Sequence, residues 1–486
     1  MDATGNPATL NLAVTVGGGL RKMKIGFPGY GKGEALTNFP VLVVLGPNLS
    51  TNGFAYDQVC SPEAHDLVFM NAEESQELNY EIETWDTKGS SYVWVQVPVL
   101  ATNSYIWAYW GDTNLSVGPQ AYRTNGSVWA SGYVGVWHFR ESAGMAWDSA
   151  FSGTAGQVFT NFGGCTQGVV GKIGNGVVFF GGYITASAAN LPKGTSPRTL
   201  SAWFRKSSSS VPSPGKEILG YGDNSAGGRF ALWIGGNGSA SSLGMETCSG
   251  GRSFPWNWDS KWHHLAAVLP AGQYDAGVVK LFHDGVENTS ATGSGTINTA
   301  SSELSMAAIP LYHNGDRACD FDGILDEVRI SNVDRSATWL WSEFMTSSSN
   351  SVFTSYGPVE KVLDAFGIPE AWKMKYFGTT TGPNTGGLED WDEDGMDNLS
   401  EYLAGTNPAD SSSLLHFSEA VRSPPNEVAI SWWTVAGKLY TIQESTNPFS
   451  PASWISRTTD LRGFGTVNLW TGHVEQAASF FRIKLQ

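Results

Sequence analysis

The chain has 486 residues, which is too long for one hydrophobic core and suggests three or four domains. Hydrophobic residues make up 41% of it and charged residues only 15%, and 45 acidic residues against 29 basic ones give a formal net charge of −16. This charge argues against a nucleic-acid backbone as the partner and agrees with a secreted protein that is exposed to calcium.

The sequence contains no membrane span and no recognisable targeting segment. No stretch approaches the roughly 18 apolar residues that a transmembrane helix needs. The first residues, Met1 to Gly5, lack a basic and an apolar region, so we expect a mature or trimmed form of an extracellular or cell-surface protein, with its signal peptide absent. The abundance of glycine (58) and tryptophan (20) favours β-sandwiches with tight turns over helical bundles.

Residues 1–127 are predicted to form a β-sandwich. Apolar or alternating runs without helical periodicity occur at Pro40–Leu45, Leu78–Trp85, Tyr92–Val97 and Tyr105–Gly111. The segments Asn38–Val41, Tyr80–Asp86, Val93–Val95 and Trp110–Asp112 resemble a bacterial domain of unknown function that often precedes a laminin-G-like domain in large exported proteins. The resemblance implies a domain boundary and no particular activity.

Glu81 and Glu83 stand two residues apart on one of these predicted strands. Their side chains leave the same face about 7 Å apart, near the carboxylate separation of inverting glycosidases. Leu78, Tyr80 and Ile82 are expected to form the core on the opposite face. We therefore interpret the two glutamates as an ordinary solvated edge rather than a catalytic pair.

Residues 128–357 are predicted to form a jelly roll. Strand-like pieces follow one another at Val136–Phe139, Gly176–Gly182, Leu200–Phe204, Trp262–Val268, Val279–Gly285 and Phe321–Ile330. Together they resemble the laminin-G-like domain, a concanavalin-like sandwich. The resemblance implies the fold, while members of the family serve in adhesion, in glycan binding and, in a few cases, in hydrolysis. Ala337–Phe344 is expected to form a short helix that closes this region.

The loop before the strand that begins near Trp262 contains the candidate ligand-binding residues Trp256, Asn257 and Trp258. Aromatic rings stack on the apolar faces of sugars while amides and carboxylates bind the hydroxyl groups. Ordinary packing is the alternative, because a chain with 20 tryptophans must bury most of them, and Trp262 is assigned to the core.

Carboxylates near the last predicted strand of the jelly roll are the candidates for acid/base chemistry. By alternation, Asp320, Asp322 and Asp326 share one strand face with Ile324 and Val328. Asp320 and Asp322 lie about 7 Å apart on this face, and Asp322 and Asp326 about 13 Å apart. A close pair raises one pKa and so supplies both an acid and a base. If the protein is an enzyme, Asp320, Asp322 and Glu246 are the predicted catalytic residues. For Asp326, the resemblance implies a structural or ion-binding role.

Three further sets of residues are open to a structural and a functional interpretation. The resemblance implies that Asp148 helps to hold a structural calcium ion. His263 and His264 point to opposite faces of a strand and cannot chelate one metal together, so at least one is expected in the core. Cys60, Cys165, Cys248 and Cys319 form no C-x-x-C motif, so we expect either one disulfide among the last three or buried free thiols.

Residues 358–414 are predicted to bind calcium. A short helix spans Ile368–Gly378, and the later loop carries carboxylates at EF-hand positions 1, 3, 5 and 12, glycine at 6, a backbone carbonyl at 7 and asparagine at 9. The predicted calcium ligands are Asp390, Asp392, Asp394, Met396, Asn398 and Glu401. The loop with its continuation to Pro408 resembles the short calcium-binding repeat of exported bacterial proteins. Because the preceding helix is farther away than in an EF-hand, we expect a rigid clip between domains rather than a switch.

Residues 415–486 are predicted to form a last sandwich. Its strand markers are Glu427–Trp432, Leu439–Ser445 and Ser479–Leu485. The segment resembles a fibronectin type III-like module, which implies spacing or attachment.

The fold class predicted from these segments is all-β, a multidomain β-sandwich and jelly-roll protein with a short helical calcium-binding insert. The favoured function is an exported bacterial modular protein that binds a polysaccharide, a glycan or a cell-surface protein through its jelly roll and is rigidified by calcium. The alternatives are an endo-acting glycoside hydrolase on the same face and, third, a self-assembling extracellular filament subunit. No G-x-S-x-G, H-E-x-x-H or phosphate-binding glycine loop occurs, which removes the easily recognised hydrolase and nucleotide-binding classes.

Overall fold

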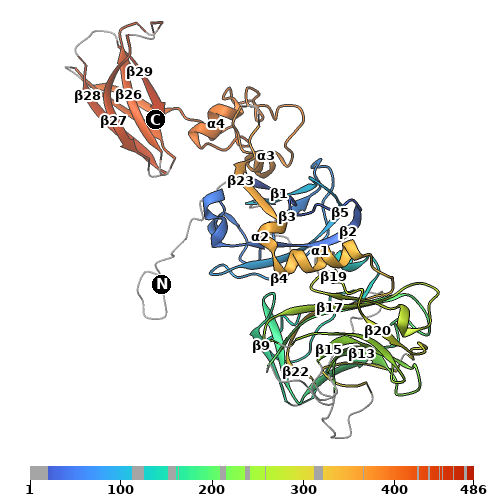
Figure 1. Ribbon diagram of the computed structural model, residues 1–486. Coiled ribbons are helices and arrows are strands. Elements are labelled where there is room, and N and C mark those ends of the chain that lie inside the picture. Colours follow the sequence, from blue (N-terminus) through green and yellow to red (C-terminus); the bar gives the residue numbers. More distant parts are fainter. Residues whose placement is uncertain are drawn as a thin grey trace, which may run out of the picture. The chain divides into compact units, whose positions relative to one another are not determined.

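The structure is a computed structural model of the chain (Figure 1). The residues that it describes are 20–111, 125–150, 160–162, 164–207, 215–235, 241–257, 259–300, 302–310, 321–364, 366–423, 426–435, 438–447, 449–450, 453–463, 465–474 and 479–485. Two compact units are present: Arg21–Gly111 with Leu115–Glu360 form one, and Lys361–Gln486 form the other. Antiparallel sheets dominate both units, which confirms the predicted all-β class. None of the described helices is long and apolar enough to cross a lipid bilayer.

The first domain of the larger unit consists of two sheets. One has the strand order β23 (Ser355–Lys361), β1 (Arg21–Gly26), β6 (Tyr105–Trp110), β3 (Val68–Met70), and the other has the order β2 (Leu36–Leu45), β5 (Ser91–Leu100), β4 (Tyr80–Thr84). Short 3-10 helices occupy Pro47–Asn52, Tyr56–Gln58 and Ser127–Trp129. The buried side chains of both sheets, such as Val41, Val95 and Trp110, form one core.

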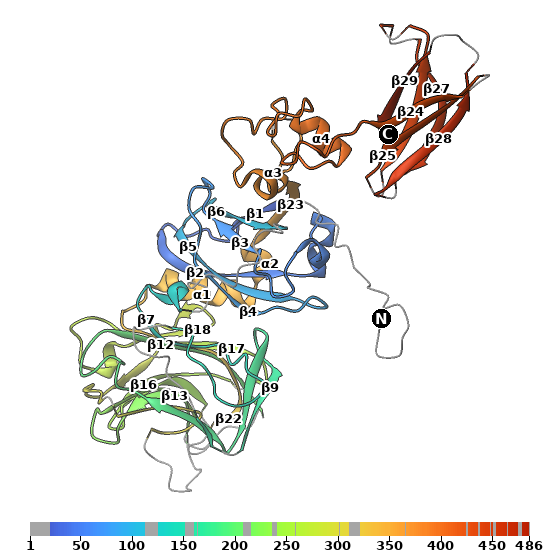
Figure 2. The same cartoon turned by 180° about the vertical axis from the view of Figure 1, so that it is seen from behind.

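The jelly roll consists of two eight-stranded sheets. The inner sheet, which faces the first domain in Figures 1 and 2, has the order β19 (Val286–Glu287), β18 (Lys280–His283), β17 (His263–Leu269), β12 (Arg198–Lys206), β22 (Asp322–Ser331), β10 (Asn175–Phe180), β9 (Cys165–Val170), with β7 (Tyr133–Trp137) also paired to β22. The outer sheet has the order β20 (Thr292–Ser294), β16 (Gly251–Pro255), β15 (Ser242–Glu246), β14 (Arg229–Gly235), β13 (Lys216–Gly222), β21 (Glu303–Met306), β11 (Tyr183–Ser187), β8 (Thr160–Phe162). A 3-10 turn occupies Ala276–Val278.

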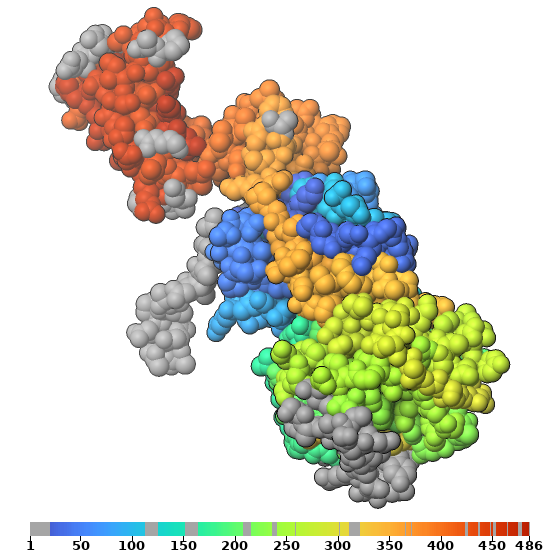
Figure 3. Space-filling view, in the orientation of Figure 1, coloured from blue at the N-terminus to red at the C-terminus, as the bar shows by residue number. Residues whose placement is uncertain are grey.

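The chain returns to the first domain after the jelly roll. Helix α1 (Ala337–Ser348) confirms the helix expected from Ala337 and extends beyond it, and α2 (Asn350–Phe353) and β23 follow. Thr346 accepts a hydrogen bond from Leu42 N at 2.9 Å, and Trp339 packs edge-on against Phe39. On the other side of the helix, Leu340 packs against the jelly roll in a cluster with Phe282. Figure 3 shows this orange segment between the blue first domain and the green jelly roll.

Strand β22 presents a charged surface toward the first domain because its alternation is interrupted. Leu325 and Val328 belong to the jelly-roll core, while Asp326 and Glu327 between them both leave the other face. Glu327 has a positive φ of 50°, and the pairing with β12 shifts register at this point, as in a β-bulge. The expectation that Asp326 and Val328 share a face is therefore wrong.

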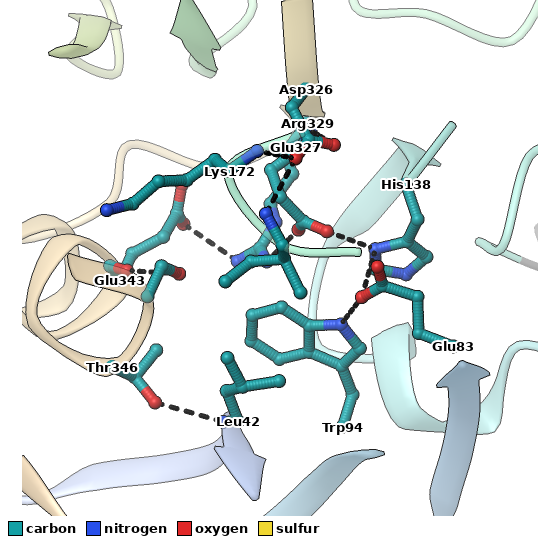
Figure 4. Close-up of polar contacts among 12 residues, drawn as sticks. Leu42, Glu83, Trp94, His138, Lys172, Asp326, Glu327, Arg329, Glu343 and Thr346 are labelled. Carbon is teal, nitrogen blue, oxygen red and sulfur yellow. Dashed lines mark hydrogen bonds and ion pairs between the residues drawn. The ribbon is translucent and has the colours of Figure 1, made fainter. Parts of the chain in front are cut away.

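The interface of the first domain and the jelly roll is a buried network of charged and aromatic groups (Figure 4). His138 Nδ1 lies 2.6 Å from Glu327 Oε1 and 3.6 Å from Glu83 Oε2. Glu83 also accepts a hydrogen bond from the indole of Trp94 at 2.8 Å. The guanidinium of Arg329 lies 2.5 Å from Glu327 Oε2. Each of these side chains is almost fully buried.

The interpretation of Glu81 and Glu83 as a solvated edge is wrong. The two side chains do share a face, but that face is covered by the jelly roll, and the residues retain only 7% and 5% of their exposure. Glu81 accepts hydrogen bonds from Trp129 Nε1 at 2.8 Å and from Ser149 Oγ at 2.7 Å, and it pairs with Arg140 at 2.6 Å. Its carboxylate is thus fully engaged in holding the interface.

The network contains more acidic than basic groups, and the pKa values reflect this excess. Burial and the neighbouring Glu327 raise the pKa of Glu83 to about 8. Burial and the same neighbour also raise the pKa of Asp326, whose Oδ2 accepts hydrogen bonds from Lys172 N and Ile173 N. Burial alone disfavours a charged His138, but Glu327 outweighs it and raises the histidine pKa.

Helix α1 completes the cover of the inner sheet. Glu343 accepts hydrogen bonds from Ser201 Oγ at 2.5 Å and lies 3.1 Å from His264 Nε2. Its second oxygen lies 3.7 Å from the Arg329 guanidinium. His264 is fully buried and is the core histidine that the sequence predicts. The face of β12, β17 and β22 that points away from the jelly-roll core is therefore covered by the first domain and by α1.

The smaller unit contains two helices and a sandwich. Helices α3 (Glu370–Phe377) and α4 (Asn398–Ala404) flank the acidic loop, and Gly378 ends α3 with a φ of 70°. The sandwich pairs the sheet β24 (Phe417–Ser423), β25 (Glu427–Trp433), β28 (Val467–His473) with the sheet β27 (Ile455–Arg462), β26 (Leu439–Ser445), β29 (Phe480–Leu485). Trp432 and Tyr440 lie in its core.

We predict that Arg329→Met destabilises the larger unit by about 3–5 kcal/mol, because the substitution removes the guanidinium from Glu327 and Glu343 while both carboxylates stay buried. Urea unfolding followed by tryptophan fluorescence measures the loss. Lys261→Met is the matched control: it removes a cation that is 81% exposed, 4.0 Å from Asp259, and should cost less than about 1 kcal/mol. Equal losses in the two variants would contradict the role of the network.

The raised pKa of Glu83 predicts a stability that falls as the pH rises. Between its ordinary value of 4.5 and about 8 the folded protein holds a proton at Glu83 that the unfolded chain releases. Stabilisation by that proton is fully present below pH 4.5 and is lost toward pH 8. Glu83→Gln, which mimics the protonated form, should have a flatter pH profile, so its stability relative to the parent increases from pH 5 to pH 8. Unfolding at fixed calcium concentration tests this, and parallel profiles would refute it.

Candidate functional site

The acidic loop of the smaller unit brings oxygen atoms together around one centre. Carboxylate oxygens of Asp390, Asp392 and Asp394 lie within 4.8 Å of one another. Five buried oxygens of the loop have no hydrogen-bond partner among the described residues: Asp392 Oδ1, Asp392 Oδ2, Asp394 Oδ2, Asn398 Oδ1 and Glu401 Oε2. Unpartnered buried oxygens are costly, and a cation bound among them would satisfy all of them.

Hydrogen bonds within the loop fix how these oxygens point. Asn398 donates its amide to Asn384 O at 2.8 Å and to Gly386 O at 2.7 Å, which leaves Oδ1 as the free end. Asp394 Oδ1 accepts from Met396 N, and Thr406 donates to Glu401 Oε1 at 3.2 Å. Gly395 turns the chain with a φ of 94°. The arrangement leaves one oxygen each of Asp394, Asn398 and Glu401 available.

The electrostatics of the loop also favour a cation. Burial, together with repulsion from Asp392 and Asp394, raises the pKa of Glu401 to about 7. Burial and Asp394 likewise raise the pKa of Asp392. A divalent ion removes this repulsion, and a ligand set of oxygens alone is the one that calcium prefers.

The loop is anchored on both sides. The Trp391 ring stacks on Phe377 of α3 with centroids 4.6 Å apart, and Tyr402 of α4 packs edge-on against Trp372. Lys438 of the following sandwich donates to Leu403 O at 2.6 Å. The folded loop thus connects α3, α4 and the C-terminal sandwich.

The predicted ligand-binding loop of the jelly roll lies at the rim between its two sheets. Trp256 follows β16 of the outer sheet and contacts His263 and His283 of the inner sheet edge-on, with centroid distances of 4.7 and 5.4 Å. The indole is half-buried, while Asn257 next to it is exposed. Trp258 lies outside the described residues. The rim therefore combines a fixed aromatic ring with exposed polar neighbours.

The two predicted catalytic carboxylates that the structure describes, Asp322 and Glu246, lie on different sheets. Asp322 is exposed at the start of β22 in the inner sheet, where it pairs with Phe180. Glu246 lies on β15 of the outer sheet and contacts the Arg229 guanidinium, which also lies 2.9 Å from Glu217. Asp320 lies outside the described residues. Glu246 is therefore engaged in an ion pair with Arg229.

Asp148 binds backbone amides, and two of the cysteines expected in the jelly roll are free thiols. Asp148 accepts hydrogen bonds from Val136 N and Ala150 N, each at 2.8 Å, and burial raises its pKa to about 7. It therefore fastens backbone near β7. Cys165 and Cys248 are free thiols, the first half-buried and the second exposed, and Cys319 lies outside the described residues.

The sequence patterns do not predict that three polar residues near Trp256 lie close together. His263, His283 and Asp284 approach one another with Asp259 beside them. Alternation along β17 separates His263 from His264 correctly, but His283 comes from the neighbouring strand. The register of β17 and β18, in which Leu265 faces His283, is the information that would have predicted their approach.

Two family models match parts of the chain. Residues 179–340 match the model described as the concanavalin A-like lectin/glucanases superfamily, and residues 63–147 match a domain of unknown function, DUF2341. The chain therefore contains a concanavalin-like jelly roll preceded by this domain, as the laminin-G-like and N-terminal resemblances predict. No curated protein sequence matches the chain.

Several solved structures share similarity with the chain at low identity. Domain 4 of AbnA, an extracellular arabinanase from Geobacillus stearothermophilus solved with arabinotriose, is 17% identical, with 43% of this chain and 97% of that chain covered and a TM-score of 0.31. A structure of botulinum neurotoxin type C, whose cell entry depends on interaction with two ganglioside molecules, is 12% identical, with coverage of 46% of this chain and 51% of that chain and a TM-score of 0.32. A pentraxin from Limulus polyphemus is 12% identical, with coverage of 33% and 73% and a TM-score of 0.26.

Proposed function

We propose that the protein is an exported modular protein that binds a polysaccharide or glycan at the rim of its jelly roll. The observation that carries the proposal is the position of Trp256, whose ring is held by His263 and His283 beside the exposed Asn257. Fixed rings with polar neighbours are suited to stacking on a sugar and binding its hydroxyl groups. The lectin and glucanase family model over residues 179–340 supports the same ligand class.

The covered inner sheet supports the choice of the rim. The first domain and α1 bury the outward side chains of β12, β17 and β22, among them Trp203, His264 and Arg329. A ligand of the jelly roll must then bind at the loops or at the outer sheet. Binding is favoured over hydrolysis because Glu246 is paired with Arg229 and Asp322 lies on the other sheet.

We predict that Trp256→Ala abolishes or strongly weakens binding to the polysaccharide that the parent retains in affinity electrophoresis. Loss of the indole surface on which a sugar stacks costs on the order of 1–2 kcal/mol of binding free energy, which is about a tenfold or greater loss of affinity. Trp147→Ala is the matched control, since Trp147 is a 50% exposed tryptophan that does not belong to the loop of Trp256. A panel of plant, algal and bacterial polysaccharides supplies the ligand, with reducing-end release as a parallel assay.

Two outcomes of the panel would contradict the proposal. Equal weakening by Trp256→Ala and Trp147→Ala would place the ligand elsewhere. Release of reducing ends that is lost in Glu246→Gln or Asp322→Asn would replace the binding function by hydrolysis.

Calcium binding by the acidic loop forms the second part of the proposed function. Asp390, Asp392, Asp394, Asn398 and Glu401 would supply side-chain oxygens and Met396 its carbonyl, as in an EF-hand loop. Five unpartnered buried oxygens support this assignment. Because the loop is fastened to α3, α4 and the C-terminal sandwich, calcium would stiffen the smaller unit, which is suited to an extracellular environment.

We predict that calcium at a hundredfold excess over its Kd stabilises the smaller unit by about 2.7 kcal/mol and that a chelator removes this gain. Asp392→Ala and Glu401→Ala should unfold alike with and without calcium. Glu393→Gln is the matched control, because Glu393 is an exposed acid of the same loop that is no predicted ligand. Differential scanning calorimetry measures the shift, and a parent protein that is insensitive to the chelator would contradict the assignment.

A further inference from the structure

The rim of the jelly roll contains a group of side chains whose nitrogen and oxygen atoms could act as metal ligands. His263 begins β17, His283 ends β18, and Asp284 follows in the turn to β19. Leu265 faces His283 across the two strands, so His263, two residues before Leu265, lies diagonally from His283 on the same face. Antiparallel pairing thus brings together two histidines that are 20 residues apart.

Three donor atoms of this group form a small triangle. His263 Nδ1 lies 2.9 Å from Asp284 Oδ2 and 3.2 Å from His283 Nε2, and the third side, from His283 Nε2 to Asp284 Oδ2, is 3.6 Å. A zinc ion with bonds of about 2.0–2.1 Å in a tetrahedral site holds its ligand atoms about 3.3–3.4 Å apart. The three sides of the triangle, from 2.9 to 3.6 Å, lie on both sides of this separation, so small shifts of the side chains would admit the ion.

Hydrogen bonds alone satisfy the triangle poorly. The Nδ1 of His263 faces both a carboxylate oxygen and a second imidazole nitrogen, and it carries at most one proton. Two ring nitrogens 3.2 Å apart repel each other unless one of them donates. A cation among the three atoms lets all of them act as lone-pair donors. A proton on His263 competes with the cation for this position.

The surrounding contacts orient the donors as in known metal sites. The other ring nitrogen of His263, Nε2, lies 2.9 Å from Asp259 Oδ1, and a carboxylate in this position fixes the tautomer of a metal-binding histidine. Asp284 Oδ1 accepts a hydrogen bond from His264 N at 2.9 Å, which leaves Oδ2 for the ion. Trp256 packs edge-on against both imidazoles and restricts their rotation.

The group is also accessible from solvent. The side chains of His263, His283 and Asp284 keep 12%, 21% and 31% of their exposure, so an ion can enter without unfolding of the rim. Two imidazoles and one carboxylate suit zinc and other late first-row ions rather than calcium, which prefers oxygen.

We propose that His263, His283 and Asp284 bind a divalent transition-metal ion, with zinc as the best fit, and that Asp259 orients His263. Three protein ligands leave one position of a tetrahedral ion open to water or to an oxygen of a bound molecule. The site is separate from the calcium loop and does not depend on the proposed carbohydrate binding.

Zinc titration of the full chain without a histidine tag tests the site. The protein is stripped with a chelator, returned to excess calcium, and titrated with zinc in competition with a chromophoric indicator at mildly alkaline pH. We expect one zinc ion per chain in the parent and in His65→Ala, the matched control, because His65 is a histidine 3.0 Å from Glu63 that belongs to no group of three donors among the described residues. His263→Ala and His283→Ala should each weaken zinc binding at least about tenfold, and Asp259→Asn should weaken it by a smaller factor.

Two further measurements separate a metal site from a folding defect. Cobalt should give the visible absorption of a four-coordinate ion in the parent and in His65→Ala but not in His283→Ala. Zinc should raise the Tm of the parent and leave that of His283→Ala unchanged, while circular dichroism shows that the variant is folded. Parental zinc affinity in His263→Ala and His283→Ala, or a parent that binds no zinc, would overturn the proposal.

Discussion

The burial of charged side chains between the first domain and the jelly roll is the constraint on which the larger unit depends. Glu83, His138, Glu327 and Arg329 meet in a region that excludes water, and the indoles of Trp94 and Trp129 border the Arg329 guanidinium with centroids at 4.5 and 5.0 Å. Removal of one charge leaves its partners uncompensated, so the network tolerates change poorly. It therefore favours one docking geometry of the two sandwiches over any other.

This docking determines which surfaces remain for function. Jelly rolls of this class have two sheets, and here the side chains on the outside of β12, β17 and β22 are covered by the first domain and by α1. The rim around Trp256 stays accessible, and it carries both the proposed sugar contact and the proposed zinc ligands His263 and His283. The proposed calcium loop belongs to the smaller unit, where a bound ion would stiffen that unit.

Local sequence patterns predicted most of what depends on near neighbours along the chain. The all-β class, the helices at Ala337 and Glu370 and the convergence of Asp390, Asp392 and Asp394 all follow from short spacings. The exposure of Glu81 and Glu83 was misjudged because alternation shows which side chains share a face but not what covers that face. Asp326 and Glu327 share a face because the strand bulges at Glu327, where φ is positive. A positive φ is uncommon for residues other than glycine, so the sequence does not predict this bulge. The approach of His263 and His283 depends on strand register.

Hydrogen exchange of the intact chain, read by mass spectrometry, tests most directly whether the charged network makes the first domain and the jelly roll one cooperative unit. We predict that peptides from β4 and β5 exchange with the same free energy of opening as peptides from β22, and that Arg329→Met lowers this free energy in all of them together. Faster exchange of β4 and β5 at unchanged protection of β22 would show that the two sandwiches open independently, and it would contradict the central role of their buried charges.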